Sequence, residues 1–244
     1  MVSFLDKILD VLYPAVSYCS FCQSRQESRE IRGLCCYCLK KIVFVANNYC
    51  VCCGRQLPEE RDVRCKFCAA IDFYFDQARA VTLYQGIIEK IIYRFKYEQE
   101  RRLADSLGQL LLLFYGKYFS EIKIDGLIYV PLHKKRRKLR GFNQAELLAR
   151  ELFNYTGLNI YNNLLIRNRQ TPPLYELTYR ERQHVLQNAF RLNYKYKLQE
   201  KNLLLIDDIF TTGSTVNEIS RLLKTKTKIN NIYVFTLATA NSDF

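Results

Sequence analysis

Apolar residues recur with two different periods beyond about residue 75, and these periods predict the secondary structure there. Residues 78–84 alternate apolar and polar positions, which is typical of a strand with one buried face. The segments 87–95 and 103–114 space their apolar residues three or four apart, which gathers them on one face of a helix. The remaining patterned segments predict strands at 126–132, 202–207 and 231–240, and helices at 143–157 and from about 216 to 225.

This alternation of strands and helices predicts an α/β domain over residues 76–244, a parallel sheet flanked by helices. Residues 1–75 differ in composition, because all ten cysteines lie there, and we expect them to form a small module of their own. Within it, residues 4–12 carry apolar side chains at helical spacing. That spacing favours a short helix packed on the protein, with a membrane-surface anchor as the alternative.

The stretch LLLIDDIFTTGSTV, residues 203–216, is a candidate ligand site, because ligands bind beyond the carboxyl ends of parallel strands. Asp207 and Asp208 follow an apolar run where we expect the strand to end. A loop rich in hydroxyl groups comes next, made of Thr211, Thr212, Gly213, Ser214 and Thr215. Such a loop at a helix N-terminus suits a phosphate. Two carboxylates would repel that phosphate unless they bind sugar hydroxyls or magnesium, so the motif predicts a sugar-phosphate site.

Charge and hydropathy narrow the classes of partner and location. The 37 basic and 24 acidic residues give a formal net charge of +13, which favours a polyanionic partner such as nucleic acid or a phosphorylated substrate. No apolar run reaches the roughly 18 residues that a membrane span requires. The N-terminal segment carries Asp6 and Asp10 and lacks the basic start of a secretory signal, so we expect a cytoplasmic protein.

The cysteines form four C-x-x-C pairs, a spacing that lets a tight turn direct two thiolates at one metal ion. The pairs are Cys19 and Cys22, Cys35 and Cys38, Cys50 and Cys53, and Cys65 and Cys68. Two pairs complete a tetrahedral set, so the sequence predicts two structural zinc sites that stabilise loops too short to bury much apolar surface. Disulfides and an iron–sulfur cluster are less favoured alternatives. Sequential pairing into tandem zinc ribbons is favoured over interleaved pairing, with Cys36 and Cys52 as spare thiols.

The motif LLLIDDIFTTGST resembles the 5-phosphoribosyl 1-diphosphate (PRPP) signature of type I phosphoribosyltransferases. The resemblance implies a type I phosphoribosyltransferase-like domain in which Asp207 and Asp208 are the catalytic pair and bind the ribose hydroxyls, with Mg²⁺. The loop from Thr211 to Thr215 would bind the 5′-phosphate. Purine-salvage enzymes of this kind usually carry an acid at the position of Thr211, so hypoxanthine or guanine is disfavoured as the acceptor, while amines, other bases and no acceptor stay open. An ordinary strand–turn–helix with a polar cap is the alternative.

Longer segments resemble the ComF/GntX-like family, and the resemblance covers essentially the whole chain. They are the cysteine pairs, residues 93–108, residues 129–150 with RGFNQ, and the stretch from Arg167 to Phe190. The resemblance implies a double zinc ribbon joined to the transferase-like domain and a role in natural competence, where incoming single-stranded DNA is handled. It implies competence or recombination proteins as partners, and relatives of this fold often form homodimers. Leu174 and Val185 stand where the family often has polar residues, which puts acceptor recognition and catalysis in doubt.

Six basic residues are concentrated directly after Pro131. They are Lys134, Lys135, Arg136, Arg137, Lys138 and Arg140. We expect a loop that binds pyrophosphate, single-stranded DNA or both, with a solvated loop as the third interpretation. His133 is a weaker candidate for a general base. Two functions stay open: a magnesium-dependent phosphoribosyltransferase with an unknown acceptor, and a non-catalytic DNA-binding competence factor that uses the transferase fold for ligand sensing or architecture.

Overall fold

The computed structural model describes residues 18–25, 31, 33–58, 63–172 and 177–240; the helix expected over residues 4–12 and the departure at Leu174 lie outside them. Its helices are α2 (Cys36–Lys40), α3 (Lys66–Ala70), α4 (Ile87–Tyr97), α5 (Leu103–Phe119), α6 (Lys134–Arg140), α7 (Gln144–Thr156), α8 (Tyr179–Leu186) and α9 (Ser214–Lys226). Its strands are β1 (Gln77–Leu83), β2 (Gly126–Tyr129), β3 (Leu165–Arg167), β4 (Phe190–Leu192), β5 (Asn202–Phe210) and β6 (Asn231–Thr239). Within these ranges, no helix has the length and apolar character needed to span a bilayer.

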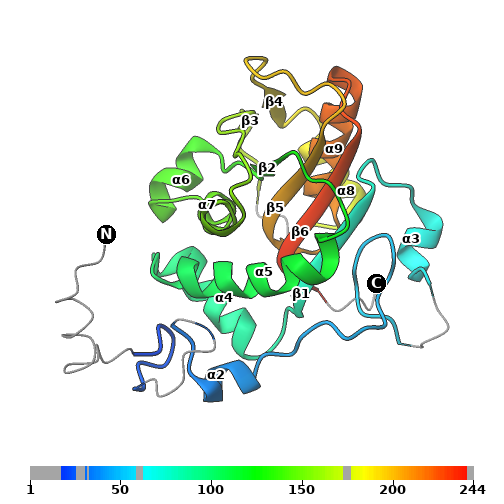
Figure 1. Cartoon of the computed structure of the whole chain (residues 1–244). Coiled ribbons are helices and arrows are strands. Elements are labelled where there is room, and N and C mark those ends of the chain that lie inside the picture. Colours follow the sequence, from blue (N-terminus) through cyan, green and yellow to red (C-terminus); the bar gives the residue numbers. More distant parts are fainter. Residues whose placement is uncertain (1–17, 26–30, 32, 59–62, 173–176, 241–244) are drawn as a thin grey trace.

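Four parallel strands form the central sheet, in the order β1-β6-β5-β2 (Figure 1). The two inner strands, β5 and β6, are mostly buried because helices lie on both sides of the sheet. Helices α5 and α7 pack on one side, and α8 and α9 lie on the other (Figure 1). The predicted parallel sheet flanked by helices is therefore confirmed. The short antiparallel sheet of β3 and β4 was not predicted from the sequence.

Helices α4, α5, α7 and α9 form where the apolar spacing predicts helices, within a few residues at their ends. All four buried residues of α4 lie on one face, and they are Ile88, Ile91, Ile92 and Phe95. Helix α7 begins after Asn143, whose side chain accepts a hydrogen bond from the backbone N–H of Ala145. It ends at Gly157, whose left-handed conformation is the usual way to terminate a helix.

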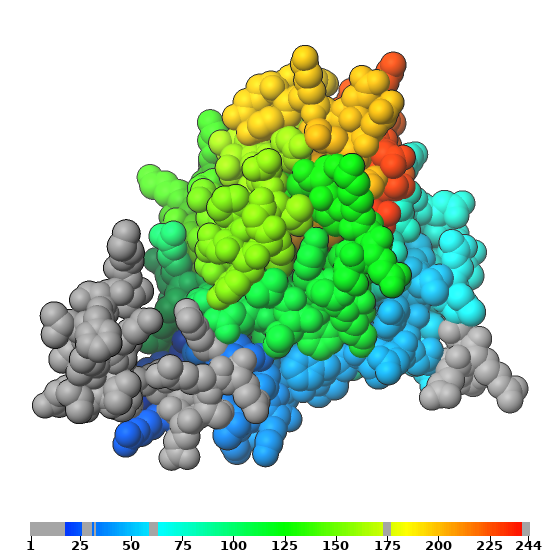
Figure 2. All heavy atoms as spheres, in the orientation of Figure 1, coloured from blue at the N-terminus to red at the C-terminus, as the bar shows by residue number. Residues whose placement is uncertain are grey.

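The cysteine-rich segment covers the edge of the sheet at β1. Its residues 43–45 form an antiparallel bridge to this strand, with the N–H of Val45 donating to the carbonyl of Val81 at 3.0 Å. Figure 2 shows the segment, in blue to light blue, along the base of the molecule. A free strand edge would leave N–H and C=O groups unpaired, so this segment completes the sheet. One continuous hydrophobic core includes both parts of the chain, and a domain division at residue 75 stays a prediction.

The basic run after Pro131 is a helix, α6, and the loop expected there is wrong. His133 is its N-cap, and the imidazole Nδ1 accepts a hydrogen bond from the N–H of Lys135 at 3.4 Å. Gly141 ends the helix in the left-handed conformation. Because α6 buries none of its residues, it has no apolar periodicity from which a helix could be predicted.

Candidate functional site

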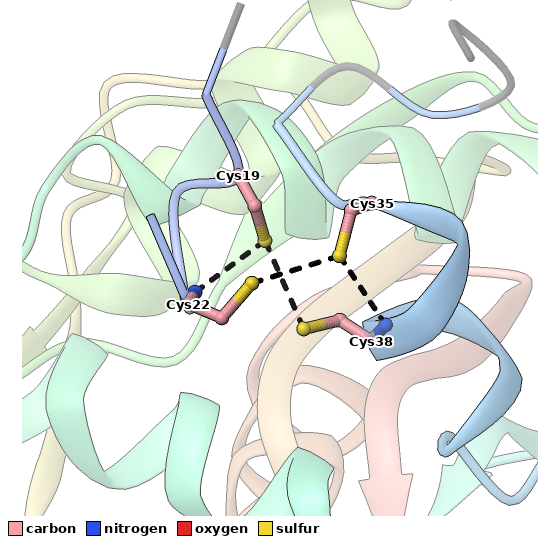
Figure 3. A group of neighbouring side chains, drawn as sticks. All are labelled: Cys19, Cys22, Cys35 and Cys38. Carbon is pink, nitrogen blue, oxygen red and sulfur yellow. Dashed lines mark hydrogen bonds between the residues drawn. The ribbon is translucent and has the colours of Figure 1, made fainter. Parts of the chain in front are cut away.

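The first cysteine tetrad brings together the sulfurs of Cys19, Cys22, Cys35 and Cys38 (Figure 3). The Sγ atoms of Cys19 and Cys38 lie 3.8 Å apart, and those of Cys22 and Cys35 lie 3.6 Å apart. Four sulfurs placed tetrahedrally about zinc, at about 2.3 Å from it, are separated by about 3.8 Å. The tetrad therefore has the dimensions of a zinc site, and its position between two C-x-x-C turns matches the prediction.

The second tetrad consists of Cys50, Cys53, Cys65 and Cys68, whose sulfurs all lie within 4.8 Å of one another. Helix α3 begins directly after Cys65, and the N–H of Cys68 points to the Cys65 sulfur at 3.4 Å, which favours the thiolate. Both tetrads join consecutive pairs, so sequential pairing is confirmed and interleaved pairing is excluded. Four thiolates complete each coordination shell, which is typical of structural rather than catalytic zinc.

Asp207 and Asp208 lie within β5, because this strand continues past them to Phe210 instead of ending before them. Neighbouring residues of a strand point to opposite faces, so the two carboxylates have different surroundings. Asp208 is buried, and its Oδ1 forms an ion pair of 2.8 Å with Nζ of Lys96 on α4. Burial, followed by the negative charge of Asp208, raises the pKa of Asp207 above its usual range, while the charges of Lys96 and Arg167 oppose that shift.

The loop after β5 is shorter than predicted, because α9 begins at Ser214. The hydroxyl oxygens of Thr212 and Ser214 lie 2.8 Å apart, and both side chains are buried. Arg182 of α8 donates from Nη1 to the hydroxyl oxygen of Thr211 at 3.1 Å. In the described part of the chain, no backbone hydrogen bond occupies the N–H of Gly213. This N–H, the first N–H groups of α9 and the Arg182 guanidinium are therefore the groups that suit a phosphate.

Replacing Gly213 by alanine is expected to destabilise the protein by about 2–4 kcal/mol. A Cβ atom there would lie 2.6 Å from Cζ of Phe210, and the φ of +75° strains any L-residue. Gly157 is the matched control, since its φ is +69° and a Cβ would meet nothing within 4 Å. Gly157→Ala thus isolates the backbone strain. Urea unfolding measures both variants, and equal losses would contradict the close packing at Gly213.

Buried arginines supply positive charge near the two acids. Arg167, at the end of β3, is buried, and this burial, together with the charge of Arg136, lowers its pKa to about 10. The negative charge of Asp207 opposes this shift by raising the pKa of Arg167, so this carboxylate and the guanidinium are close enough to interact electrostatically. Arg136 of α6 donates from Nη2 to the carbonyl of Thr171 at 3.0 Å. One member of the predicted basic run therefore lies near Arg167, which in turn interacts with Asp207.

The other basic residues of α6 face elsewhere. Arg137 forms an ion pair of 3.0 Å with Glu146. The guanidinium of Arg140 lies 4.9 Å from the ring centroid of Tyr97. The three lysines of α6 are exposed to solvent. The run is therefore divided between the candidate site, helix packing and an open basic surface.

Four charged residues of the site were not assigned a role from the sequence. They are Lys96, Arg167, Arg182 and Arg55, the last of which donates a hydrogen bond to the carbonyl of Thr211. Lys96, Arg167 and Arg182 fall in segments that resemble the ComF/GntX-like family. This resemblance is the sequence feature that could have identified them as candidate site residues. Arg55 lies in the cysteine-rich segment, 156 positions before its partner, where no local pattern indicates the contact.

Comparisons with known proteins agree with both parts of the chain. Residues 8–71 match the double zinc ribbon domain family, and this range includes both tetrads. The DNA utilization protein YhgH of Shigella flexneri is 34% identical over 150 residues, which cover 59% of this chain and 65% of that protein. A hypoxanthine phosphoribosyltransferase from Staphylococcus aureus overlaps 61% of this chain and 69% of its own, with 15% identity and a TM-score of 0.33. That structural likeness is too loose to bear on activity.

Competence protein F of Haemophilus influenzae is a relative whose match covers most of this chain. It is 33% identical over 212 residues, which cover 85% of this chain and 91% of that protein. The match is longer than residues 76–244, so it includes part of the cysteine-rich segment as well as the α/β region. The chain is a member of the competence protein F (ComF) family, with a double zinc ribbon preceding its α/β domain.

Proposed function

We propose that this chain binds PRPP with Mg²⁺ at the carboxyl-terminal part of β5 and acts in DNA uptake as a phosphoribosyltransferase with an acceptor still to be identified. The observation that carries the proposal is the carboxylate pair of Asp207 and Asp208 near the end of β5, followed by a short loop into α9. Lys96 pairs with Asp208, and Arg182 donates to the loop. Lys96 offsets the charge of Asp208 within the protein, whereas the raised pKa of Asp207 shows that its charge is less fully offset and would be stabilised by a bound cation. The printed names of the relatives, a competence protein and a DNA utilization protein, support the DNA context.

The groups present fit a magnesium-bound donor. Magnesium is usually held by one or two carboxylates together with the phosphate oxygens of a substrate, and Asp207 and Asp208 supply the carboxylates. When bound, the ion would neutralise negative charge that develops on the departing pyrophosphate. The protein itself adds positive charge through Lys96 and Arg167, which interact with the two carboxylates. The N-terminus of α9 binds the 5′-phosphate. In the transfer, the bond from ribose C1 to pyrophosphate breaks as the bond to the acceptor forms.

Binding of PRPP with Mg²⁺ is expected to strengthen as pH rises above the ordinary range of a carboxyl group. The raised pKa of Asp207 leaves this carboxyl protonated at pH values where an ordinary aspartate is ionised, so that it lacks the negative charge that attracts a cation and accepts hydrogen bonds less strongly. Affinity should therefore rise by up to about tenfold per pH unit until Asp207 is deprotonated. Calorimetry across a pH series measures this dependence.

Asp207→Asn is the control for the pH series, since PRPP itself also changes protonation. The variant should bind more weakly and keep only the pH dependence that the ligand contributes. A wild-type profile parallel to that of Asp207→Asn would show that Asp207 does not titrate in the site.

Binding of single-stranded DNA is a second candidate function, and the exposed basic surface of α6 favours it. The three lysines of α6 lie in solvent within one short helix, where they are available to a phosphate backbone. Such contacts do not depend on base sequence and weaken as salt increases. This function is compatible with PRPP binding, because the three exposed lysines are not among the residues proposed to bind the donor.

Replacing Lys134, Lys135 and Lys138 together by glutamine is expected to weaken DNA binding and to lower the salt slope of log K by about 2. The matched control removes the same charge from Lys197, Lys226 and Lys228, which are exposed near the amino ends of β5 and β6. Fluorescence anisotropy with a labelled oligonucleotide, at several salt concentrations, measures both triples. Equal slopes for the two triples would refute a DNA contact at α6.

A further inference from the structure

The C-x-x-C turn of Cys50 and Cys53, in the second tetrad, contacts the loop of residues 211–213 through one buried side chain, Arg55. We call this loop the phosphate loop. Arg55 lies two positions after the zinc ligand Cys53, and its carbonyl accepts a hydrogen bond of 2.8 Å from the N–H of Cys50. Its backbone is therefore part of the turn that holds two cysteines of the second tetrad. Gly54 presses the same turn against β1, since a Cβ there would lie 2.7 Å from the carbonyl of Ala78.

The side chain of Arg55 reaches from this turn to the loop after β5. It is 1% exposed, and its guanidinium donates to the backbone carbonyl of Thr211. Its carbon Cζ lies 5.2 Å from the ring centroid of Phe67 and 5.8 Å from that of Phe210. Phe67 lies between the zinc ligands Cys65 and Cys68 in the sequence, and Phe210 directly precedes the loop. The guanidinium therefore contacts one aromatic ring of the second zinc site and one next to the candidate site.

Aromatic packing makes this connection rigid on both sides. The ring of Phe67 meets Phe73 at 6.0 Å and the first residue of α8, Tyr179, at 5.0 Å between centroids. Phe210 also packs against the position of Gly213, where no side chain fits. The hydrogen bond from Arg55 fixes the carbonyl of Thr211, and with it the plane of the peptide that joins Thr211 to Thr212. The N–H of Thr212 lies in this plane, so its direction is fixed as well.

We propose that the second zinc site positions the phosphate loop through Arg55, so that this residue is a positioning residue for the 5′-phosphate of the donor. The inference rests on the proposed function for its ligand, while its structural part concerns the loop alone. Loss of zinc from the second tetrad, by chelation or thiol oxidation, then lowers the affinity for the donor. The residues that touch the donor stay chemically unchanged, but the loop is no longer held in position. This makes donor binding sensitive to the metal and redox state of a cysteine cluster.

Arg55→Ala tests the proposal with two readouts. Calorimetric binding of ribose 5-phosphate, which carries only the sugar and the 5′-phosphate, should weaken about tenfold, and hydrogen exchange of the amides in residues 211–216 should accelerate. Both zinc ions should remain bound by mass spectrometry. Arg55→Lys, which restores a positive donor without the planar stacking, should recover part of the affinity. Arg64→Ala is the matched control, an exposed arginine directly before Cys65 that should change neither readout.

Unchanged affinity and unchanged loop exchange in zinc-replete Arg55→Ala would overturn the proposal. Should that variant not fold, the same criteria apply to Arg55→Gln, which keeps an N–H donor and most of the volume. Cys53→Ser should lose the zinc ion of the second tetrad and should also accelerate hydrogen exchange in residues 211–216. Cys52→Ser should retain both zinc ions and the slow exchange of the wild type. Slow exchange in Cys53→Ser would refute the connection between the zinc site and the loop. Failure of the wild type to bind ribose 5-phosphate or PRPP, with the loop still loosened in Arg55→Ala, would instead refute the proposed function.

Discussion

Cys38→Ser should reduce the zinc content from two ions per chain to one and unfold the first zinc ribbon. Zinc binding by a four-thiolate site supplies about 10–16 kcal/mol to a small metal-dependent fold, more than a typical domain's whole stability. Serine does not replace a thiolate as a zinc ligand, so the tetrad of Cys19, Cys22, Cys35 and Cys38 keeps only three sulfurs. Native mass spectrometry measures the metal content, and circular dichroism measures the loss of folded structure.

Cys36 offers a matched control two positions away on the same helix. Its side chain is exposed, and it belongs to neither tetrad. Cys36→Ser should therefore keep both zinc ions and the thermal stability of the wild type. Retention of two ions by Cys38→Ser, or loss of one by Cys36→Ser, would show that the metal is not held by the sulfurs that the structure brings together.

Replacing Asp207 and Asp208 together by asparagine should weaken the binding of PRPP with Mg²⁺ by about 10² to 10⁴-fold. Hydrogen bonds to charged groups contribute about 1.5–3 kcal/mol each, and both carboxylates are proposed to bind the donor or its metal ion. Asparagine keeps the size of each side chain while removing the charge. Lys96 then loses its partner of 2.8 Å, so part of the expected loss arises from a partly buried cation without a counter-charge.

The matched control removes two negative charges elsewhere. Glu121 and Glu200 are exposed, and Glu200 lies just before the amino end of β5, opposite the candidate site. The double variant Glu121→Gln/Glu200→Gln has the same net charge as the aspartate double variant and should bind PRPP like the wild type. Equal weakening in both would indicate a general charge effect rather than a site on β5.

The sequence predicted the sheet, the pairing of cysteines and the two acids because each depends on a local pattern. C-x-x-C spacing requires only a tight turn, and the apolar face of α4 follows from a regular period. The same reasoning failed for α6, which buries nothing and so has no period. β5 extends beyond the acids because its pairing with β6 continues to Phe210, and a strand's partner cannot be read from one segment.

The contacts that surround the acids depend on distant parts of the chain. Lys96 forms an ion pair with Asp208, although 112 positions of the chain separate the two residues. Arg182 and Arg55 reach the loop from α8 and from the zinc module. In the sequence each is one basic residue among 37, and composition does not distinguish a buried arginine from a solvated one. Only the folded arrangement shows which cations lie beside the carboxylates.

Calorimetric titration of PRPP with Mg²⁺ into zinc-replete protein is the most direct measurement of the central claim, and the titration is repeated with single-stranded DNA present. The account predicts saturable binding of one PRPP per chain, which depends on Mg²⁺ and is lost in Asp207→Asn/Asp208→Asn. Absence of saturable binding by the folded wild type, or binding that persists in the double variant, would contradict the assignment of β5 and the α9 N-terminus as the donor site.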